Sequence, residues 1–522
     1  MRKIHYALLG GIALIIGGIA IACFNPKRPL ASDYARSPSH AIATTEETKL
    51  KQAIDPGMKA HPGQSGFELL PRGEDSLLFR IAMIEAAERS LDIQYYIIQD
   101  DMTGKLLLEA VLRAADRGVR VRILMDDLNI RGSDPTWPLL NAHPDIEIRV
   151  FNPFATRDEP LFTCLSNVFT GLGQFSKRMH NKVLIADNQV AIAGGRNLGD
   201  SYFDVSSDFN FRDVDVLAAG PIVAKLSQSF DKYWNDDEAF PITALLQPRD
   251  DPEEAAKLHQ ELRQHWQDEM RKGTIVSQVP LSVQIEQGKI PLLWALAELA
   301  ADSPSKINTP KEIVGSKPGL RLDQMADEAQ HEFIVISPYF VPGKEGTEGL
   351  QALIRRDVKV RILTNSLASI DAVVAYTGYR RYRQTLVEDG IDLYETKPVP
   401  GTHPHSRRFS SSARDSLHSK IYVVDRRDVM IGSFNLDPRS VNLNTEIVLV
   451  IHSPRLADQV VRMFEKATSP SSSFHLVMHN HHLEWITRED DQERLYESEP
   501  KAGFWRNVEA DLFALLPFEN QL

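Results

Sequence analysis

The spacing of apolar residues changes between two periods along most of this chain, and these periods predict strands and helices in alternation. Residues 89–99 (RSLDIQYYIIQ) carry an apolar run that predicts a buried strand. Residues 103–118 space their apolar side chains for an amphipathic helix, and residues 119–127 alternate as a further strand. Residues 146–154 predict a third strand. Such alternation indicates an α/β sheet packed between helices.

The same succession returns in the second half of the chain. Strands are predicted at 331–342, 358–366 and 391–399, with a helix at 346–357 between the first two. Internal repetition is the sign of a repeated structural unit. We therefore expect two homologous α/β domains arranged about a pseudo-twofold axis.

Each half then reaches a stretch of the form H-x-K-x-x-x-x-D followed by G-[GS]-x-N. The copies are MHNKVLIADNQVAIAGGRN from Met179 and LHSKIYVVDRRDVMIGSFN from Leu417. On a strand, side chains at i and i+2 share a face, so the His and Lys of each copy point the same way, and a turn at the Asp brings the Asn back beside them. The site residues predicted from these copies are His180, Lys182, Asp187, Asn197, His418, Lys420, Asp425, Ser433 and Asn435.

Two such hairpins facing each other would surround one spot with two imidazoles, two ammoniums and two amides. This set suits a phosphodiester, because one imidazole can attack phosphorus while the other protonates the leaving alcohol. No metal or other cofactor is required. An orienting carboxylate is expected behind each imidazole. The candidates lie on the next strand of each half: Asp213 in the first half, with Asp215 as its alternative, and Glu446 in the second.

Net charge and the number of cysteines disfavour some classes of function. The 522 residues carry 59 Lys and Arg against 71 Asp and Glu, and the net charge of −12 disfavours a general affinity for nucleic acid. The only cysteines, Cys23 and Cys164, exclude a disulfide scaffold. The histidines between 475 and 482 lack a fixed spacing to an acidic ligand, so we interpret them as surface residues and predict no metal site.

The N-terminus carries 19 uncharged residues from Tyr6 to Phe24, enough at about 1.5 Å each to approach a hydrocarbon core of about 30 Å. Three interpretations compete: a transmembrane anchor, which we favour, a cleaved signal peptide, or a lipoprotein signal ending at Cys23. The expected division of the chain is an anchor or signal at 1–25, a linker at 26–64, a first domain at 65–245, a connecting helical segment at 246–285, a second domain at 286–470 and a C-terminal tail at 471–522.

The doubled motif resembles that of the phospholipase D superfamily over roughly residues 65–465. Longer stretches, among them LDIQYYIIQDDMTGKLL, RDVDVLAAGP and the tail segments LEWITRED and ALLPFENQL, are similar to the bacterial cardiolipin synthase branch and its C-type members. The resemblance implies two phospholipase D-like α/β sandwich domains that enclose one active site. It also implies a phosphohistidine intermediate and transfer of a phosphatidyl group to phosphatidylglycerol, with phosphatidylglycerol or phosphatidylethanolamine as donor.

The resemblance further assigns roles. His180 would be the nucleophile and His418 the acid and then the base. Lys182, Lys420, Asn197 and Asn435 would hold the phosphate with help from Ser433, which Gly195 replaces in the first copy. Asp187 and Asp425 would stabilise the hairpins or the neighbouring half.

Three other functions compete with phosphatidyl transfer. A phospholipase D would use the same intermediate with water as acceptor. A nuclease of the same superfamily is disfavoured by the acidic balance and the membrane segment, and a non-catalytic scaffold by two intact motifs. We therefore expect phospholipid substrates and a membrane, but no nucleic acid, as partners. We expect the chain at the bacterial inner membrane with its catalytic body in the periplasm.

Overall fold

The structure is a computed structural model that describes residues 34, 36–130, 135–153, 177–247, 249, 251–273, 281–287, 289–309, 315–398 and 414–514. The expected anchor and both cysteines lie outside these residues. Within the described ranges, no helix combines the length and apolar character needed to cross a bilayer. The same ranges contain no group of three or more His, Cys, Asp or Glu side chains able to hold a metal ion.

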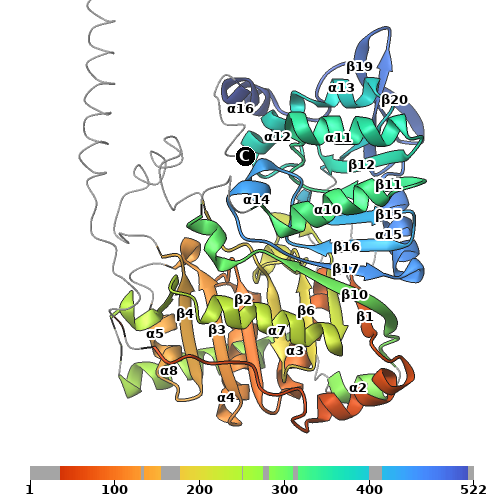
Figure 1. Ribbon diagram of the computed structural model, residues 1–522. Helices are drawn as coiled ribbons and strands as arrows, with labels where there is room; N and C mark the ends of the chain where they lie inside the picture. Colours follow the sequence, from red (N-terminus) through yellow and green to blue (C-terminus); the bar gives the residue numbers. More distant parts are fainter. Residues whose placement is uncertain are drawn as a thin grey trace, which may run out of the picture.

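The first half of the chain forms one side of an 18-stranded mixed sheet (Figure 1). Its strands pair in the order β9–β4–β3–β2–β5–β6–β8–β1, with β2, β3 and β4 parallel and the other pairs antiparallel. Their bounds are β1 Ser65–Leu70, β2 Ser90–Tyr95, β3 Arg120–Asp126, β4 Ile146–Phe151, β5 Val183–Ala186, β6 Val190–Gly194, β8 Asp215–Ala219 and β9 Ala239–Pro241.

The second half continues the sheet in a matching order, β18–β13–β12–β11–β15–β16–β17–β10, and β11, β12 and β13 are again parallel. The halves join where β1 and β10 run antiparallel, as the lower and upper bodies of Figure 1 show. The bounds are β10 Leu293–Ala301, β11 Glu332–Ile336, β12 Lys359–Asn365, β13 Asp392–Thr396, β15 Ile421–Val424, β16 Asp428–Gly432, β17 Ile447–His452, β18 Ser473–His479, β19 His482–Glu489 and β20 Gln492–Tyr496. A separate parallel pair, β7 (Phe209–Arg212) and β14 (Arg414–Leu417), bridges the halves.

Helices cover both faces of this sheet. In the first half they are α2 Lys49–Ala60, α3 Gly73–Ala86, α4 Met102–Asp116, α5 Thr136–Asn141, α7 Pro221–Trp234, α8 Pro252–Lys272 and α9 Leu281–Glu286. In the second half they are α10 Lys317–Glu328, α11 Gly343–Arg355, α12 Val373–Arg380, α13 Arg383–Glu388, α14 Pro438–Asn442, α15 Pro454–Ala467 and α16 Phe504–Ala514. Short 3-10 turns lie at η2 Asp127–Asn129, η4 Asp200–Tyr202, η5 Ile242–Ala244 and η6 Pro304–Ile307.

The apolar core has three parts, and one of them is shared between the halves. The shared cluster includes Phe230 of α7 and Phe464 of α15 together with buried residues of β5 and β15. The other two clusters each belong largely to one half. The motif hairpins therefore sit on a common hydrophobic layer, and this layer holds the two halves in fixed register.

The strands and helices predicted from the hydrophobic pattern are confirmed at β2, α4, β3 and β4 and at β11, α11, β12 and β13. The segment expected as a linker differs, because it contains α2, whose Leu50, Ala53 and Ile54 are buried on one helix face. The expected tail also differs, since β18 pairs with β13 and extends the sheet. The connecting helix α8 packs against α4 and α5 and buries Leu262.

Candidate functional site

The two motif histidines lie just before the hairpins that the sequence predicts, not within their strands. His180 precedes β5 and His418 precedes β15. Each is fixed by the other half of the chain: His180 N donates to Thr445 O at 2.9 Å, and His418 N donates to Arg212 O at 2.8 Å. Thr445 directly precedes Glu446, and Arg212 directly precedes Asp213. Each histidine is therefore held by the residue next to a candidate carboxylate of the other half.

The orienting carboxylates also cross between the halves, whereas the sequence predicts each histidine's carboxylate on the next strand of its own half. His180 Nδ1 lies 2.9 Å from Glu446 Oε2, and His418 Nδ1 lies 2.6 Å from Asp213 Oδ2. Asp215, the alternative to Asp213, instead accepts hydrogen bonds from Ser76 Oγ at 2.7 Å and Arg80 Nη2 at 2.9 Å. Since Nδ1 of each imidazole is engaged, Nε2 is the ring nitrogen left for chemistry.

The titratable groups of the two motifs lie near enough to influence one another's pKa values. Burial lowers the pKa of His180 to about 4, against the opposing effect of Glu446 and with help from Lys182 and Lys420. Burial likewise holds the pKa of His418 well below its usual value, and Lys420, Lys182 and His180 lower it further. Neutral imidazoles at neutral pH are the form that a nucleophile requires.

The two lysines are enclosed beside the histidines. Lys182 Nζ donates to His180 O at 2.6 Å, and Lys420 Nζ donates to His418 O and lies 3.0 Å from His418 Nδ1. Burial lowers the pKa of Lys182 to about 7 and that of Lys420 to about 8. A bound phosphodiester anion would favour the protonated form of both amines, so they are suited to neutralise phosphate oxygens.

The surroundings of the two carboxylates differ. Glu446 accepts hydrogen bonds from Ser433 Oγ and, at 2.9 Å, from Ser440 Oγ. Burial would raise the pKa of Glu446, but its interactions with His180 and Lys182 outweigh burial, so the pKa is lowered.

Asp213 has fewer donors. Its Oδ1 accepts from Val214 N at 2.7 Å, and burial raises its pKa to about 6. The position equivalent to Ser433 is Gly195, where a Cβ would lie 2.6 Å from both Asp213 carboxylate oxygens. Ser433 of the second copy therefore donates a hydrogen bond to Glu446, whereas Gly195 of the first copy leaves space for the carboxylate of Asp213.

The closing amides are also unequal. Asn197 Nδ2 donates to Tyr202 Oη at 3.0 Å, and its Oδ1 accepts from Ile97 N at 3.2 Å. Asn435 is buried, and its Oδ1 finds no hydrogen-bond partner among the described residues. Asn197 is thus committed to holding the site together, while Asn435 leaves an amide oxygen that can accept a hydrogen bond.

The motif aspartates lie at the far ends of β5 and β15 from the histidines. Asp187 accepts hydrogen bonds from three successive backbone N–H groups at residues 88–90. Asp425 does the same for residues 330–332. Both residues take positive φ values in the hairpin turn. They fasten the beginnings of β2 and β11 to the hairpins and take no part in the cluster around the histidines.

Sequence reasoning missed the aromatic and polar residues that line the histidines. Tyr96 meets His180 edge-on at 5.2 Å between ring centroids, and Tyr339 meets His418 edge-on at 6.4 Å. Both follow the first parallel strand of their half, in YYI and PYF, and this repetition was a usable signal. Two supporting residues gave a weaker signal in the sequence. Asp126 at the end of β3 accepts from Met179 N at 2.9 Å, and Asn365 at the end of β12 accepts from Leu417 N at 2.9 Å.

The amino-acid sequence of the chain matches proteins of a known family. A family model described as "Cardiolipin synthase, PLD-like domain" matches residues 80–234 and 322–468. Cardiolipin synthase C of Escherichia coli (strain K12) is 37% identical over 476 residues, covering 90% of this chain and 99% of the relative. Cardiolipin synthase of Geobacillus kaustophilus is 27% identical, covering 76% of this chain and 64% of the relative.

A solved structure supports the fold alone. The phosphatidylserine synthase of Haemophilus influenzae Rd KW20 superposes with a TM-score of 0.53 at 14% identity, and the match covers 90% of this chain and 100% of that one.

Proposed function

The chain belongs to the cardiolipin synthase family with phospholipase D-like domains, and from this premise we propose that it makes cardiolipin by passing a phosphatidyl group to phosphatidylglycerol. The observation that carries the proposal is the crossed pair of dyads, His180 with Glu446 and His418 with Asp213. Two oriented imidazoles with two buried amines supply a nucleophile, an acid and oxyanion stabilisation.

In the proposed first step, His180 Nε2 attacks the phosphorus of the donor lipid. A P–N bond forms as the P–O bond to the donor's headgroup breaks. The charge of the bound phosphodiester favours the protonated form of His418, whose imidazolium gives its Nε2 proton to the leaving oxygen and becomes neutral. In the second step, His418 takes the proton from the terminal hydroxyl of phosphatidylglycerol. That oxygen attacks phosphorus, the P–N bond breaks and His180 is restored. Lys182, Lys420 and Asn435 hold the phosphate oxygens throughout.

We also propose that the two halves are homologous phospholipase D-like domains, with boundaries near 65–245 and 286–470, related by a pseudo-twofold axis. The matching strand order supports this, with β2–β3–β4 parallel in one half and β11–β12–β13 in the other. The reciprocal contacts of the two motifs support it as well. On this model the axis passes between the dyads, so one phosphorus meets both histidines.

Contact with a membrane is part of the proposal, with the apolar run at residues 6–24 as anchor and the body in the periplasm. Helix α16 supports it independently, because Phe504, Trp505 and Leu512 are 72%, 79% and 61% exposed. Arg506 of this helix donates to the backbone oxygens of Leu367 and Ile370. The adjoining Asp371 accepts from Tyr339 Oη at 2.7 Å, close to His418.

The exposed apolar residues of α16 would bind the membrane and so place the candidate active site next to the headgroups of its lipid substrates. Because the proposed anchor would itself carry the full chain to vesicles, the test uses a chain that begins at residue 34, and in it F504S/W505S should weaken flotation with phosphatidylglycerol vesicles. Unchanged flotation would argue against α16 as a membrane contact.

Lipid analysis of bacteria that lack cardiolipin tests the enzymatic proposal. Expression of the intact chain should restore cardiolipin, and the His180→Ala variant, expressed at the same level, should not. Accumulation of phosphatidic acid without cardiolipin would identify water as the acceptor and make the enzyme a hydrolase. Absence of both products from cells with well-folded protein would refute the proposal.

A further inference from the structure

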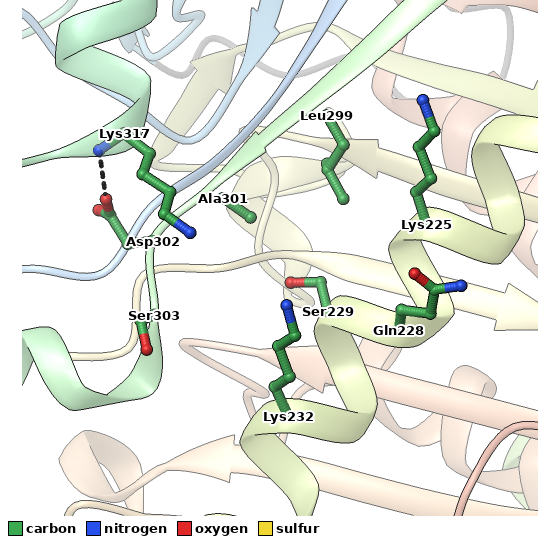
Figure 2. Close-up of a pocket in the computed structure, with 9 residues that line it drawn as sticks. All are labelled: Lys225, Gln228, Ser229, Lys232, Leu299, Ala301, Asp302, Ser303 and Lys317. Carbon is green, nitrogen blue, oxygen red and sulfur yellow. Dashed lines mark hydrogen bonds between the residues drawn. The ribbon is translucent and has the colours of Figure 1, made fainter.

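A polar hollow lies at the junction of the two halves, and its lining includes neither His180 nor His418. It has a volume of about 220 Å³ between α7 and the end of β10. Lys225, Gln228, Ser229 and Lys232 line it from positions i, i+3, i+4 and i+7 of α7, which form one helix face. Figure 2 shows Lys225 and Lys232 projecting from α7 and Lys317 reaching in from the other wall. We call this hollow the lysine pocket.

The charge of the lysine pocket is strongly one-sided. Within the described part of the chain, no ion pair joins Lys225, Lys232 or Lys317 to a carboxylate. Among the described residues, Asp302 is the one acidic residue of the lining, and its carboxylate already accepts from Lys306 Nζ at 2.7 Å and Lys317 N at 2.8 Å. Three ammoniums that form no ion pair with any described carboxylate, in a chain of net charge −12, make this a local positive site.

We propose that the lysine pocket binds the phosphate group of a phosphate ester. Three ammoniums, the Gln228 amide and the hydroxyls of Ser229 and Ser303 supply donors from two walls, as a tetrahedral oxyanion requires. A volume of about 220 Å³ accommodates a phosphate with a small alcohol but not a lipid chain. The same chemistry fits a phospholipid headgroup or a free phosphoester.

The wall of the lysine pocket is joined to the active site through Asp302. Asp302 N donates to Glu446 O at 3.0 Å, and Glu446 N donates back to Asp302 Oδ2 at 3.1 Å. Tyr233 Oη of α7 donates to Asp302 O at 2.9 Å. Asp302 thus belongs both to the pocket and to the support of the His180–Glu446 dyad, so the lysines, not Asp302, are the residues to vary.

Equilibrium dialysis of the full chain in neutral detergent with radiolabelled inorganic phosphate tests the proposal. Wild type should bind at two sites. The variant K182Q/K420Q should retain the lysine pocket alone, and adding K225Q/K232Q/K317Q to it should weaken the remaining binding by at least about tenfold. A control that removes equal charge from exposed lysines, K257Q/K344Q/K359Q, should leave that binding unchanged. Equal binding by the pocket variant and the control would overturn the proposal.

The source of the phosphate is decided by competition on the K182Q/K420Q background. If a lipid headgroup is the ligand, monomeric dihexanoyl phosphatidylglycerol should displace phosphate at lower concentration than glycerol phosphate does. Equal displacement would identify a free phosphoester. Displacement by neither compound would overturn the assignment to phosphate esters. These readouts need no turnover, so they stand or fall separately from the proposed transfer reaction.

Discussion

His180 and His418 hold equivalent places in the two motif copies, yet their carboxylates are supported differently. Glu446, behind His180, is surrounded by serine hydroxyls, and its pKa is lowered. Asp213, behind His418, has a backbone N–H in their place, and its pKa is raised to about 6. A permanently ionised partner suits a histidine that must become a phosphorylated cation, whereas a titrating partner suits one that gives and takes a proton. The duplicated site thus holds two unlike dyads.

The largest effect is expected from removing the histidines. His180→Ala should lower transfer by at least about 10⁴-fold with every donor, because no nucleophile remains. His418→Ala should lower transfer by about 10²–10⁴-fold with ordinary donors, because the leaving alkoxide lacks an acid.

A phosphatidyl donor with p-nitrophenol as leaving group separates these roles, since that phenolate leaves unprotonated. The first burst of p-nitrophenol should return in the His418→Ala variant and stay absent in His180→Ala. If the pattern is reversed, His418 is the nucleophile and the roles must be exchanged.

Replacing the carboxylates by amides should have the next largest effect. We expect Glu446→Gln to lower kcat by about 10³-fold and Asp213→Asn by about 10²-fold, because each amide misorients its imidazole and only Glu446 is ionised throughout the working range. The pH profile distinguishes them. Asp213 has a pKa of about 6, so it is neutral below that pH and ionised above it. The wild-type rate should rise with pH through about 6, and the rate of Asp213→Asn should stay flat there. An acidic limb that persists in Asp213→Asn would assign it to another group.

Exchanging the residues that make the halves unlike should give smaller and unequal losses. In Gly195→Ser the new Cβ would lie 2.6 Å from both Asp213 carboxylate oxygens, so the carboxylate must move from His418. We expect a loss of about 10²-fold, as in Asp213→Asn. In Ser433→Gly, Glu446 loses one donor but keeps Ser440, and a loss of about tenfold is expected. Steady-state rates of both variants decide the order, and a harmless Gly195→Ser would mean that the space around Asp213 is not limiting.

Much of the fold was accessible from sequence because its signals are local. Helix α4 and strands β2 and β3 follow from the periodicity of a few adjacent turns or pleats, and β11, α11 and β12 repeat it. Helix α2 was missed because the Pro- and Ser-rich stretch before it indicated a linker. The buried face of this helix consists of only Leu50, Ala53 and Ile54. Pro56 follows within the same helix, and a proline at that point argues against a helix.

Part of the candidate site could be predicted from the sequence, again because the signal is local. Motif spacing alone identifies the residues that the structure gathers, since His180 and Lys182 are two positions apart. Which carboxylate faces which histidine depends on how the halves dock, because Glu446 is 266 positions from His180. No local pattern carries that information. Equally, the tie between Asn197 and Tyr202 became visible only in three dimensions.

The smallest effect on catalysis is expected at the motif aspartates, which differ in exposure. Asp187 is fully buried where it binds three backbone N–H groups, whereas the donors held by Asp425 lie partly in solvent. Asp187→Ala should therefore lower the melting temperature by roughly 4–8 °C, and Asp425→Ala by roughly 2 °C, since water can replace the second carboxylate. Activity per folded molecule should stay within about twofold of wild type in both variants, because neither side chain meets the histidine cluster. Calorimetry with rates measured well below the transition checks both statements. A folded Asp187→Ala protein with abolished turnover would instead place this aspartate in the chemistry, and the separation between hairpin support and phosphate handling would no longer hold.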